Sequence, residues 1–178
     1  MEKLLKDIET AQECNHMQNE REKEKINNMK LLELTTKQKC SFCIKIVELV
    51  KSKILDEEAY DYIEKALDLS NKWMNEQTNI SYELYDLIDN EEYGFTIFQE
   101  RDDDDEMMIA LWNCVIDSFA FICRKAYESE GAKYYPEPIE FVDDRTLIHL
   151  INSFLVCSNG SSEELDVLIS EIECHEYY

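Results

Sequence analysis

Glycine and proline are scarce in this 178-residue sequence, which has three glycines and two prolines. Hairpins, phosphate-binding loops and tight β turns depend on these residues, so their scarcity disfavours a β-rich fold. Basic residues are also few, because 18 lysines and arginines stand against 40 aspartates and glutamates, and the formal net charge is −22. A chain of this charge repels a phosphate backbone, which disfavours direct binding to nucleic acid.

The common signatures of enzymes, secretion and membrane insertion are missing as well. There is no glycine-rich phosphate loop, nucleophile elbow or H-E-x-x-H motif. The N-terminal stretch Met1–Asp7 carries acids, and polar residues interrupt the longest apolar stretch, Met107–Cys123. Seven cysteines without framework spacing indicate reduced thiols. We therefore expect a cytoplasmic protein without a membrane span that is not an enzyme and uses no cofactor.

What the sequence does contain is helical periodicity. Apolar residues recur every three or four positions in the segments 37–53, 57–74, 81–89, 144–155 and 161–172. Four of these segments have a predicted N-cap residue at or just before their first position. In chain order these residues are Thr35 or Thr36, Asp56, Ser81, and Asp143 or Asp144. Residues 1–36 combine a short amphipathic spacing with alternating charges, which indicates a charged N-terminal helical segment.

The segment 103–127 is apolar on nearly every side, which is typical of a helix surrounded by other helices. Acids at Asp102–Glu106 precede it and Arg124 and Lys125 lie near its end, as the helix dipole favours. The aromatic stretch Phe95–Phe98 is predicted as an extended or irregular connection, and the proline-containing stretch Tyr134–Pro138 is predicted as an extended crossover. The sequence thus predicts an all-α fold: one domain over residues 1–178, with about six or seven helices around the central one.

Several residues have the spacing of a chemical site, and each has a simpler explanation. Cys40 and Cys43 form a C-x-x-C, but they lie on the apolar stripe of a predicted helix without a second pair, which favours core cysteines. Glu13 and His16 form one E-x-x-H, whereas a di-iron bundle needs two. His149 lies among apolar residues, which favours a hydrogen-bonded helix histidine over a catalytic base. No catalytic or metal site is predicted.

Asn113 and Asp117 are one helical turn apart inside the most apolar segment. A buried carboxylate needs a partner, and Arg124 or a tyrosine from another helix can supply it. We therefore interpret this pair as structural.

The acidic run Asp102–Glu106 has alternating acids like a calcium loop. However, its sixth position is not glycine, and Asn113 stands where the bidentate glutamate belongs. Two interpretations stay open, a solvated loop before a helix and a surface that binds a partner. Neighbouring aromatic residues favour the second, since aromatics beside charges are typical of interface hot spots. The predicted partner-binding residues are Glu91, Glu92, Tyr93, Phe98, Glu100, Asp102, Asp103, Asp104, Asp105, Glu106 and Tyr135.

Several segments between Cys40 and Asp144 have the order and residue types of a known family. They are Tyr82–Asp86, Glu91–Glu92, the aromatic stretch and acidic run that follow, Trp112–Asp117, Tyr127–Glu128 and Pro136–Pro138. In this layout the chain resembles an all-α immunity protein family of bacterial polymorphic toxin systems, the one numbered six. The resemblance implies a protein that is encoded beside a toxin gene and neutralises the cognate toxin, often a nuclease domain. The N-terminal third departs from any pattern that we can match.

Charge and resemblance lead to the same hypothesis. A nuclease needs a basic surface to hold phosphates, and an acidic inhibitor can be steered to that surface and cover it. We expect an immunity protein whose partner is a basic toxin, bound through the residues named above. Two alternatives stay open: an acidic helical adaptor or regulator whose charge serves solubility, and an enzyme that would need a bound metal or ligand.

Overall fold

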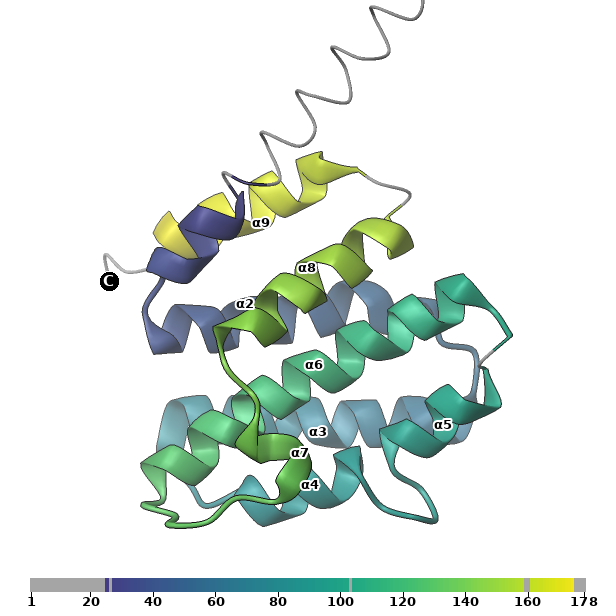
Figure 1. The fold of residues 1–178 in the computed structure, drawn as a ribbon, viewed down its shortest axis with the longest axis vertical. Helices are drawn as coiled ribbons and strands as arrows, with labels where there is room; N and C mark the ends of the chain where they lie inside the picture. The colour runs from purple at the N-terminus through teal and green to yellow at the C-terminus, as the bar shows by residue number, and fades with distance from the viewer. Residues whose placement is uncertain (1–24, 26, 103, 159–160, 175–178) are drawn as a thin grey trace, which may run out of the picture.

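The computed structural model describes residues 25, 27–102, 104–158 and 161–174, most of which are helical and none of which forms a strand (Figure 1). The all-α prediction is confirmed. Predictions for residues 1–24, including the Glu13 and His16 motif, lie outside the described residues. In chain order the elements are α2 (Thr36–Val50), the 3₁₀ helix η1 (Lys51–Lys53), α3 (Glu57–Glu76), α4 (Ser81–Ile88), α5 (Phe95–Arg101), α6 (Glu106–Ser129), α7 (Glu137–Glu140), α8 (Asp144–Cys157) and α9 (Ser162–Cys174).

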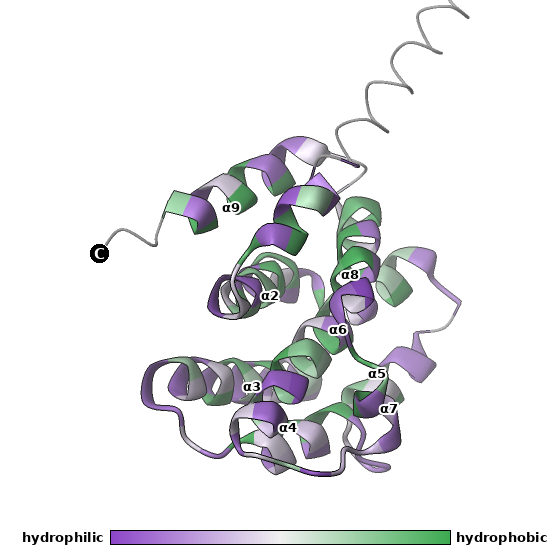
Figure 2. Cartoon of the chain, turned by 60° about the vertical axis from the view of Figure 1, so that its left-hand side comes forward, coloured by the Kyte–Doolittle hydropathy of each residue, from purple (hydrophilic) through white to green (hydrophobic). Residues whose placement is uncertain are grey.

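Helix α6 is the centre of the fold, as its apolar sequence predicts. It packs against α2, α3, α4, α5, α7 and α8, and it crosses the molecule between α2 and α8 on one side and α3 and α4 on the other (Figure 1). In Figure 2, hydrophobic residues are concentrated toward the middle of the molecule, around α6, and hydrophilic residues toward its outside. Among the described helices, α6 alone is long and apolar enough to span a membrane, and its packing against six neighbours accounts for that composition.

Polar side chains fix where the helices begin. Thr35 starts α2 with a capping box, in which its hydroxyl accepts a hydrogen bond from the backbone of Gln38. Asp56 accepts from the backbone of Ala59 at the start of α3, and Asp143 caps α8. These three caps confirm the boundaries that the sequence predicts, and they select Thr35 and Asp143 from the predicted pairs.

The predicted cap of α4 is wrong. Ser81 is the first helical residue, Ile80 holds the N-cap position, and the carboxylate of Glu130 replaces a local cap. Glu130 Oε1 accepts from the backbone nitrogens of Ile80 and Ser81 at 2.9 and 3.1 Å, and Oε2 accepts from the Ser81 hydroxyl at 2.5 Å. An anion at a helix N-terminus also interacts favourably with the helix dipole. Glu130, the residue that follows α6, therefore caps the N-terminus of α4.

Of the two stretches predicted as connections, Phe95–Phe98 is helical, which corrects the prediction, whereas residues 134–136 are non-helical as predicted and only Glu137 and Pro138 begin the short helix α7. Phe95 and Phe98 lie on one face of α5, where their rings stack on Phe119 and Trp112 of α6 at centroid distances of 5.5 and 5.7 Å. A helical turn brings two residues three apart to the same face, so burial of both rings favours the helix. In α7, Pro136 is the N-cap and Pro138 lies in the first turn, where no backbone N–H is required.

Asp117 has a partner other than those predicted from the sequence. The carboxylate Oδ2 lies 2.5 Å from Nδ1 of His149 on α8, so the predicted pairing with Arg124 or a tyrosine is wrong. Burial raises the pKa of Asp117 above its ordinary value, and the hydrogen bond with His149 offsets part of that rise. Arg124 instead pairs with Glu128 at 2.8 Å.

Candidate functional site

Two connections that are distant in sequence form one surface of the molecule. The connection between η1 and α3 lies beside the one between α5 and α6, and both appear at the right-hand end of α6 in Figure 1. A cavity of about 260 Å³ between them is lined by Ile54, Leu55, Asp56, Phe98, Arg101, Asp102, Met108 and Trp112. A neighbouring hollow of about 400 Å³ extends this region to Glu57, Tyr60 and Asp61. We call the accessible residues of this region the Leu55 surface: Leu55–Glu57, Tyr60, Asp61, Glu100–Asp102, Asp104–Glu106 and Met108.

Leu55 is the most prominent apolar residue of this surface. Its exposed fraction is 89%, whereas its neighbour Ile54 is buried in the core. The chain leaves η1 in an extended conformation at Ile54, so consecutive side chains point in opposite directions. Tyr60 and Met108 line the same hollows, so Leu55 belongs to a small apolar group beside polar residues, and tyrosine is among the residues enriched in interface hot spots.

Three carboxylates of the surface are held in place by the fold. Asp102 Oδ2 accepts a hydrogen bond from the indole nitrogen of Trp112 at 2.8 Å. Asp105 caps α6 by accepting from the backbone nitrogens of Met107 and Met108 at 2.9 and 3.3 Å. Asp56 is the N-cap of α3 described above. These charges have fixed positions, so little side-chain entropy is lost if a partner binds them.

The other charged residues of the Leu55 surface are mostly acidic. Arg101 is the only basic residue in the sequence between Lys72 and Arg124. Its guanidinium lies 4.9 Å from the centre of the Phe98 ring. Glu57, Asp61, Glu100, Asp104 and Glu106 are exposed acids of the same surface. A surface with one dominant charge sign attracts a partner of the opposite sign and repels nucleic acid.

The structure places the predicted partner-binding residues in different environments. Glu91 and Glu92 are exposed in the connection between α4 and α5, and Glu100, Asp104, Asp105 and Glu106 are exposed at the end of α5, in the connection that follows it and at the start of α6. Asp103 lies outside the described residues. Six of the predicted acids are therefore exposed, whereas Asp102 is half-buried against Trp112, and the prediction did not include Leu55.

The predicted aromatic anchors are less accessible. Phe98 is 2% exposed because its ring packs on Trp112, so it belongs to the core and not to the binding surface. Tyr93 is half-buried and its ring stacks on Tyr62 at 5.2 Å. Its hydroxyl donates a hydrogen bond to Asp86, which raises the pKa of Tyr93 to about 12. These contacts hold Tyr93 against the body of the protein.

Tyr135 lies at the other end of α6 from the acidic connection. Its ring is covered by the guanidinium of Arg124, 3.8 Å from the ring centre, and meets Tyr127 edge to face. At 1.5 Å per residue, the helix from Glu106 to Arg124 is about 27 Å long. The structure therefore does not bring Tyr135 together with the acidic run.

Sequence reasoning missed Leu55, Tyr60 and Asp61. The sequence contains one signal for them, an apolar pair at Ile54 and Leu55 between the basic residues of η1 and the acids of α3. A pair of this kind at the end of a helix places one residue inward and the next outward. Which of the two is exposed depends on the packing of Ile54, which the sequence alone does not reveal.

The chemistry available at this surface is recognition. In the part of the chain that the structure describes, no three histidine, cysteine, aspartate or glutamate side chains are grouped to hold a metal ion. The cysteines of the C-x-x-C motif, Cys40 and Cys43, are both buried in the core, and burial raises the pKa of Cys40 to about 12. Fixed carboxylates around an exposed leucine can attract and anchor a cationic protein.

Comparison with known proteins gives one match. A family model described as Immunity protein Imm6 matches residues 38–157, which run from the first turn of α2 to the last residue of α8. No curated protein and no solved structure matches the chain significantly. The matched residues include the whole Leu55 surface and exclude α9.

Proposed function

Because this chain belongs to the Imm6 immunity protein family, we propose that it binds and neutralises a cognate toxin domain by covering it with the Leu55 surface. The proposed toxin domain is basic, and a nuclease is the class that fits best. A nuclease needs cationic residues to hold phosphates, and an acidic protein can occupy that same surface. In this proposal the immunity protein acts by binding alone and meets the toxin in the cytoplasm of the producing cell.

The observation that carries this proposal is the exposed Leu55 beside carboxylates that are already fixed. Interfaces depend on a few apolar anchors surrounded by polar residues that exclude water. Asp56, Asp102 and Asp105 are held by helix caps and by Trp112, so their charges are ready for a partner before it arrives. Pre-organisation of this kind lowers the entropic cost of association.

The exposed carboxylates have a different role in the proposal. Glu100, Asp104 and Glu106 extend into solvent, where they contribute to the long-range potential that steers a cationic partner. Steering of this kind raises association rates at low salt and weakens as salt screens the charges. Fast capture matters for an inhibitor whose target is toxic while free.

The test uses the toxin domain encoded by the neighbouring gene and a charge-reversed variant, Asp104→Lys with Glu106→Lys. We expect its association rate constant to fall about tenfold or more at low salt, with a flatter salt dependence. The matched control is Glu137→Lys with Glu140→Lys, an equal charge change on exposed residues of α7, near the other end of α6. The control should bind nearly as fast as the wild type.

Equal slowing by both variants would show that net charge matters and that the Leu55 surface does not. If the neighbouring toxin domain does not bind the protein and co-expression does not protect cells from it, the proposed function is wrong.

A further inference from the structure

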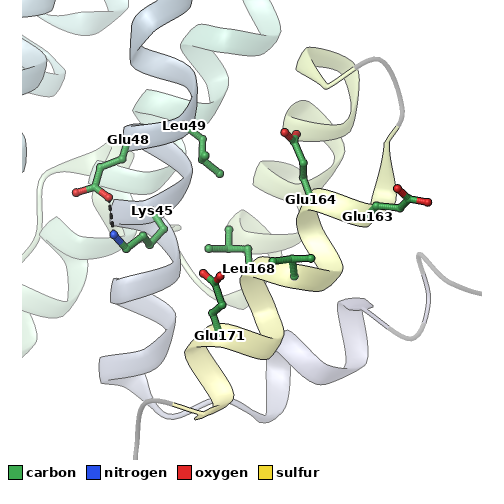
Figure 3. Close-up of a pocket in the computed structure, with 8 residues that line it drawn as sticks. Lys45, Glu48, Leu49, Glu163, Glu164, Leu168 and Glu171 are labelled. Atoms are coloured by element: carbon green, nitrogen blue, oxygen red, sulfur yellow. Dashed lines mark hydrogen bonds and ion pairs between the residues drawn. The ribbon is translucent and has the colours of Figure 1, made fainter.

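A separate hollow lies between α2 and α9 (Figure 3). Its volume is about 480 Å³, within the range of pockets that receive ligands. Leu49 of α2 and Val167 of α9 are 47% and 57% exposed, and the buried Leu168 forms the floor. We call this hollow the α2–α9 groove.

One face of α9 is turned toward the groove. Glu164, Val167, Leu168 and Glu171 are three, four and seven residues apart, which is the spacing of a single helix face. Beside the groove, another hollow of about 470 Å³ on α9 is lined by Asp166, Val167, Ser170, Glu171 and Cys174. Val167 and Glu171 line both hollows, so Val167 is an apolar ridge that is accessible from two sides.

Carboxylates form the rim of the groove. They are Glu48 on α2 and Glu163, Glu164 and Glu171 on α9. Lys45, the one cation among the lining residues, is paired with Glu48 at 2.7 Å, as the dashed line in Figure 3 shows. Helix α9 contains no lysine or arginine. The groove therefore combines an apolar floor with a negative rim.

We propose that the α2–α9 groove is a second docking site, which receives a cationic amphipathic helix of the toxin partner. This inference rests on the proposed function. A helix that lies along a groove between two helices inserts apolar residues spaced three or four apart, and its flanking lysines or arginines meet the carboxylates of the rim. The apolar side chains would contact Leu49, Val167 and Leu168.

Charge distinguishes this occupant from the alternatives. A second copy of the protein carries the same net charge of −22, and residues 1–24 of the chain contain more acids than bases. Neither complements the negative rim. A positively charged partner complements both the groove and the Leu55 surface, which lie on different parts of the molecule and share no lining residue.

The groove also differs from the Leu55 surface in its relation to the family. Its α2 wall lies inside the matched residues 38–157, whereas its α9 wall lies beyond them. The docking site is therefore completed by a helix outside the matched region.

The test uses a fluorescein-labelled 16-residue peptide of leucine and lysine whose leucines lie on one helical face. The comparison peptide has the same composition in a scrambled order, which keeps the charge and destroys the face. We expect the patterned peptide to bind at least tenfold more tightly and to shift the amide NMR signals of Leu49 and Val167. Equal binding of both peptides, or signal changes at Leu55 instead of the groove, would overturn the proposal.

A matched pair of variants localises the site. Val167→Lys places a cation in the groove, where it should weaken binding of the patterned peptide at least tenfold. Val156→Lys makes the same change at an exposed position of α8 outside the groove, 44% exposed, and should weaken it less than twofold. Equal effects of the two variants would contradict the groove. So would a concentration-dependent dimer that Val167→Lys abolishes, since a second copy would then be the occupant.

The peptide assay contains no toxin, so it separates the two proposals. If the patterned peptide does not bind but the toxin domain binds normally, the groove is not a docking site and the proposal for the Leu55 surface still stands. If the peptide binds in the groove but the neighbouring toxin domain does not bind the protein at all, the proposed function is wrong, and so is the toxin as the occupant, although the groove does bind a cationic helix.

Discussion

The indole nitrogen of the fully buried Trp112 donates its hydrogen bond to Asp102, a carboxylate of the surface loop, over 2.8 Å. Trp112 also stacks on Phe98 and lies near Phe95, so it links α5 to α6 in the core. One aspartate thus satisfies a buried donor and contributes charge to the Leu55 surface. The acidic loop is part of the folded core as well as a candidate binding site.

Asp102→Ala should destabilise the protein by about 1–3 kcal/mol, because it leaves the buried Trp112 N–H without its acceptor. Asp102→Asn retains an acceptor oxygen, so it should lower the free energy of unfolding clearly less than Asp102→Ala does. Urea unfolding followed by tryptophan fluorescence measures both variants. Asp104→Ala, an exposed position in the same loop, is the control and should change the free energy of unfolding by no more than about 0.5 kcal/mol. Equal losses for Ala and Asn at position 102 would contradict this role.

Glu130→Ala should cost about 2 kcal/mol, since it removes the carboxylate that accepts three hydrogen bonds at the start of α4. The loss should concentrate in α4, so amide hydrogen exchange in residues 81–88 should accelerate more than exchange in α8. Glu91→Ala, in an exposed connection, serves as the control. Unchanged exchange in α4 would show that the helix starts without this cap.

Leu55→Ala should weaken toxin binding by about 2 kcal/mol, the loss typical of a hot-spot residue, or about thirtyfold in Kd. Its effect on stability should be small because the side chain is 89% exposed. Tyr82→Ala on α4, also a strongly exposed apolar position, is the matched control and should bind normally. Calorimetric titration with the neighbouring toxin domain checks both variants. Normal binding of Leu55→Ala would remove this residue from the interface.

Asp117→Asn should stabilise the protein more at pH 7 than at pH 3.5. Burial raises the pKa of the Asp117 carboxyl, so the folded state holds this proton more tightly than the unfolded state. The stability that the neutral carboxyl contributes is present below the unfolded pKa of about 3.9. It is lost as pH rises through the folded pKa. Urea unfolding at pH 7 and pH 3.5 measures the difference. If Asp117→Asn changes the free energy of unfolding equally at the two pH values, the predicted role of Asp117 is wrong.

Cysteine labelling should distinguish the core from the surface. Burial raises the pKa of Cys40, Cys43 and Cys123, whereas Cys174 is exposed at the end of α9. Because the thiolate is the reactive form, iodoacetamide at pH 8 should modify Cys174 in the folded protein well before the three buried thiols. Peptide mass spectrometry follows each site, and addition of urea should remove the difference. Fast labelling of Cys43 without urea would contradict a closed core.

The sequence predicts those parts of the fold that depend on local patterns. The start of α3 follows from the capping side chain of Asp56 and the periodic apolar residues after it, and both are close together in the chain. The central position of α6 follows from its continuous apolar surface. The acidic composition of the candidate site also follows from the sequence, because charged loops before a helix remain exposed.

Features that depend on distant contacts could not be predicted in this way. Helix α5 is short and depends on the packing of Phe95 and Phe98 against α6, so its pattern resembles that of a loop. Whether Phe98 is buried or exposed depends on its packing against Trp112, which the sequence alone does not reveal. Glu130 caps a helix about 50 residues earlier in the chain, and Leu55 reaches the acidic connection only after α2, α3 and α5 pack together.

The double role of the anchored aspartates has a consequence for how such proteins diverge. A change at Asp56, Asp102 or Asp105 alters a helix start or a buried hydrogen bond, whereas a change at the solvent-exposed Asp104 or Glu106 alters mainly charge. Natural variation that retunes recognition toward a new toxin is therefore expected to accumulate at the exposed positions first. Under the proposed function, substitutions at these exposed positions would change the partner while the anchored aspartates keep the fold intact.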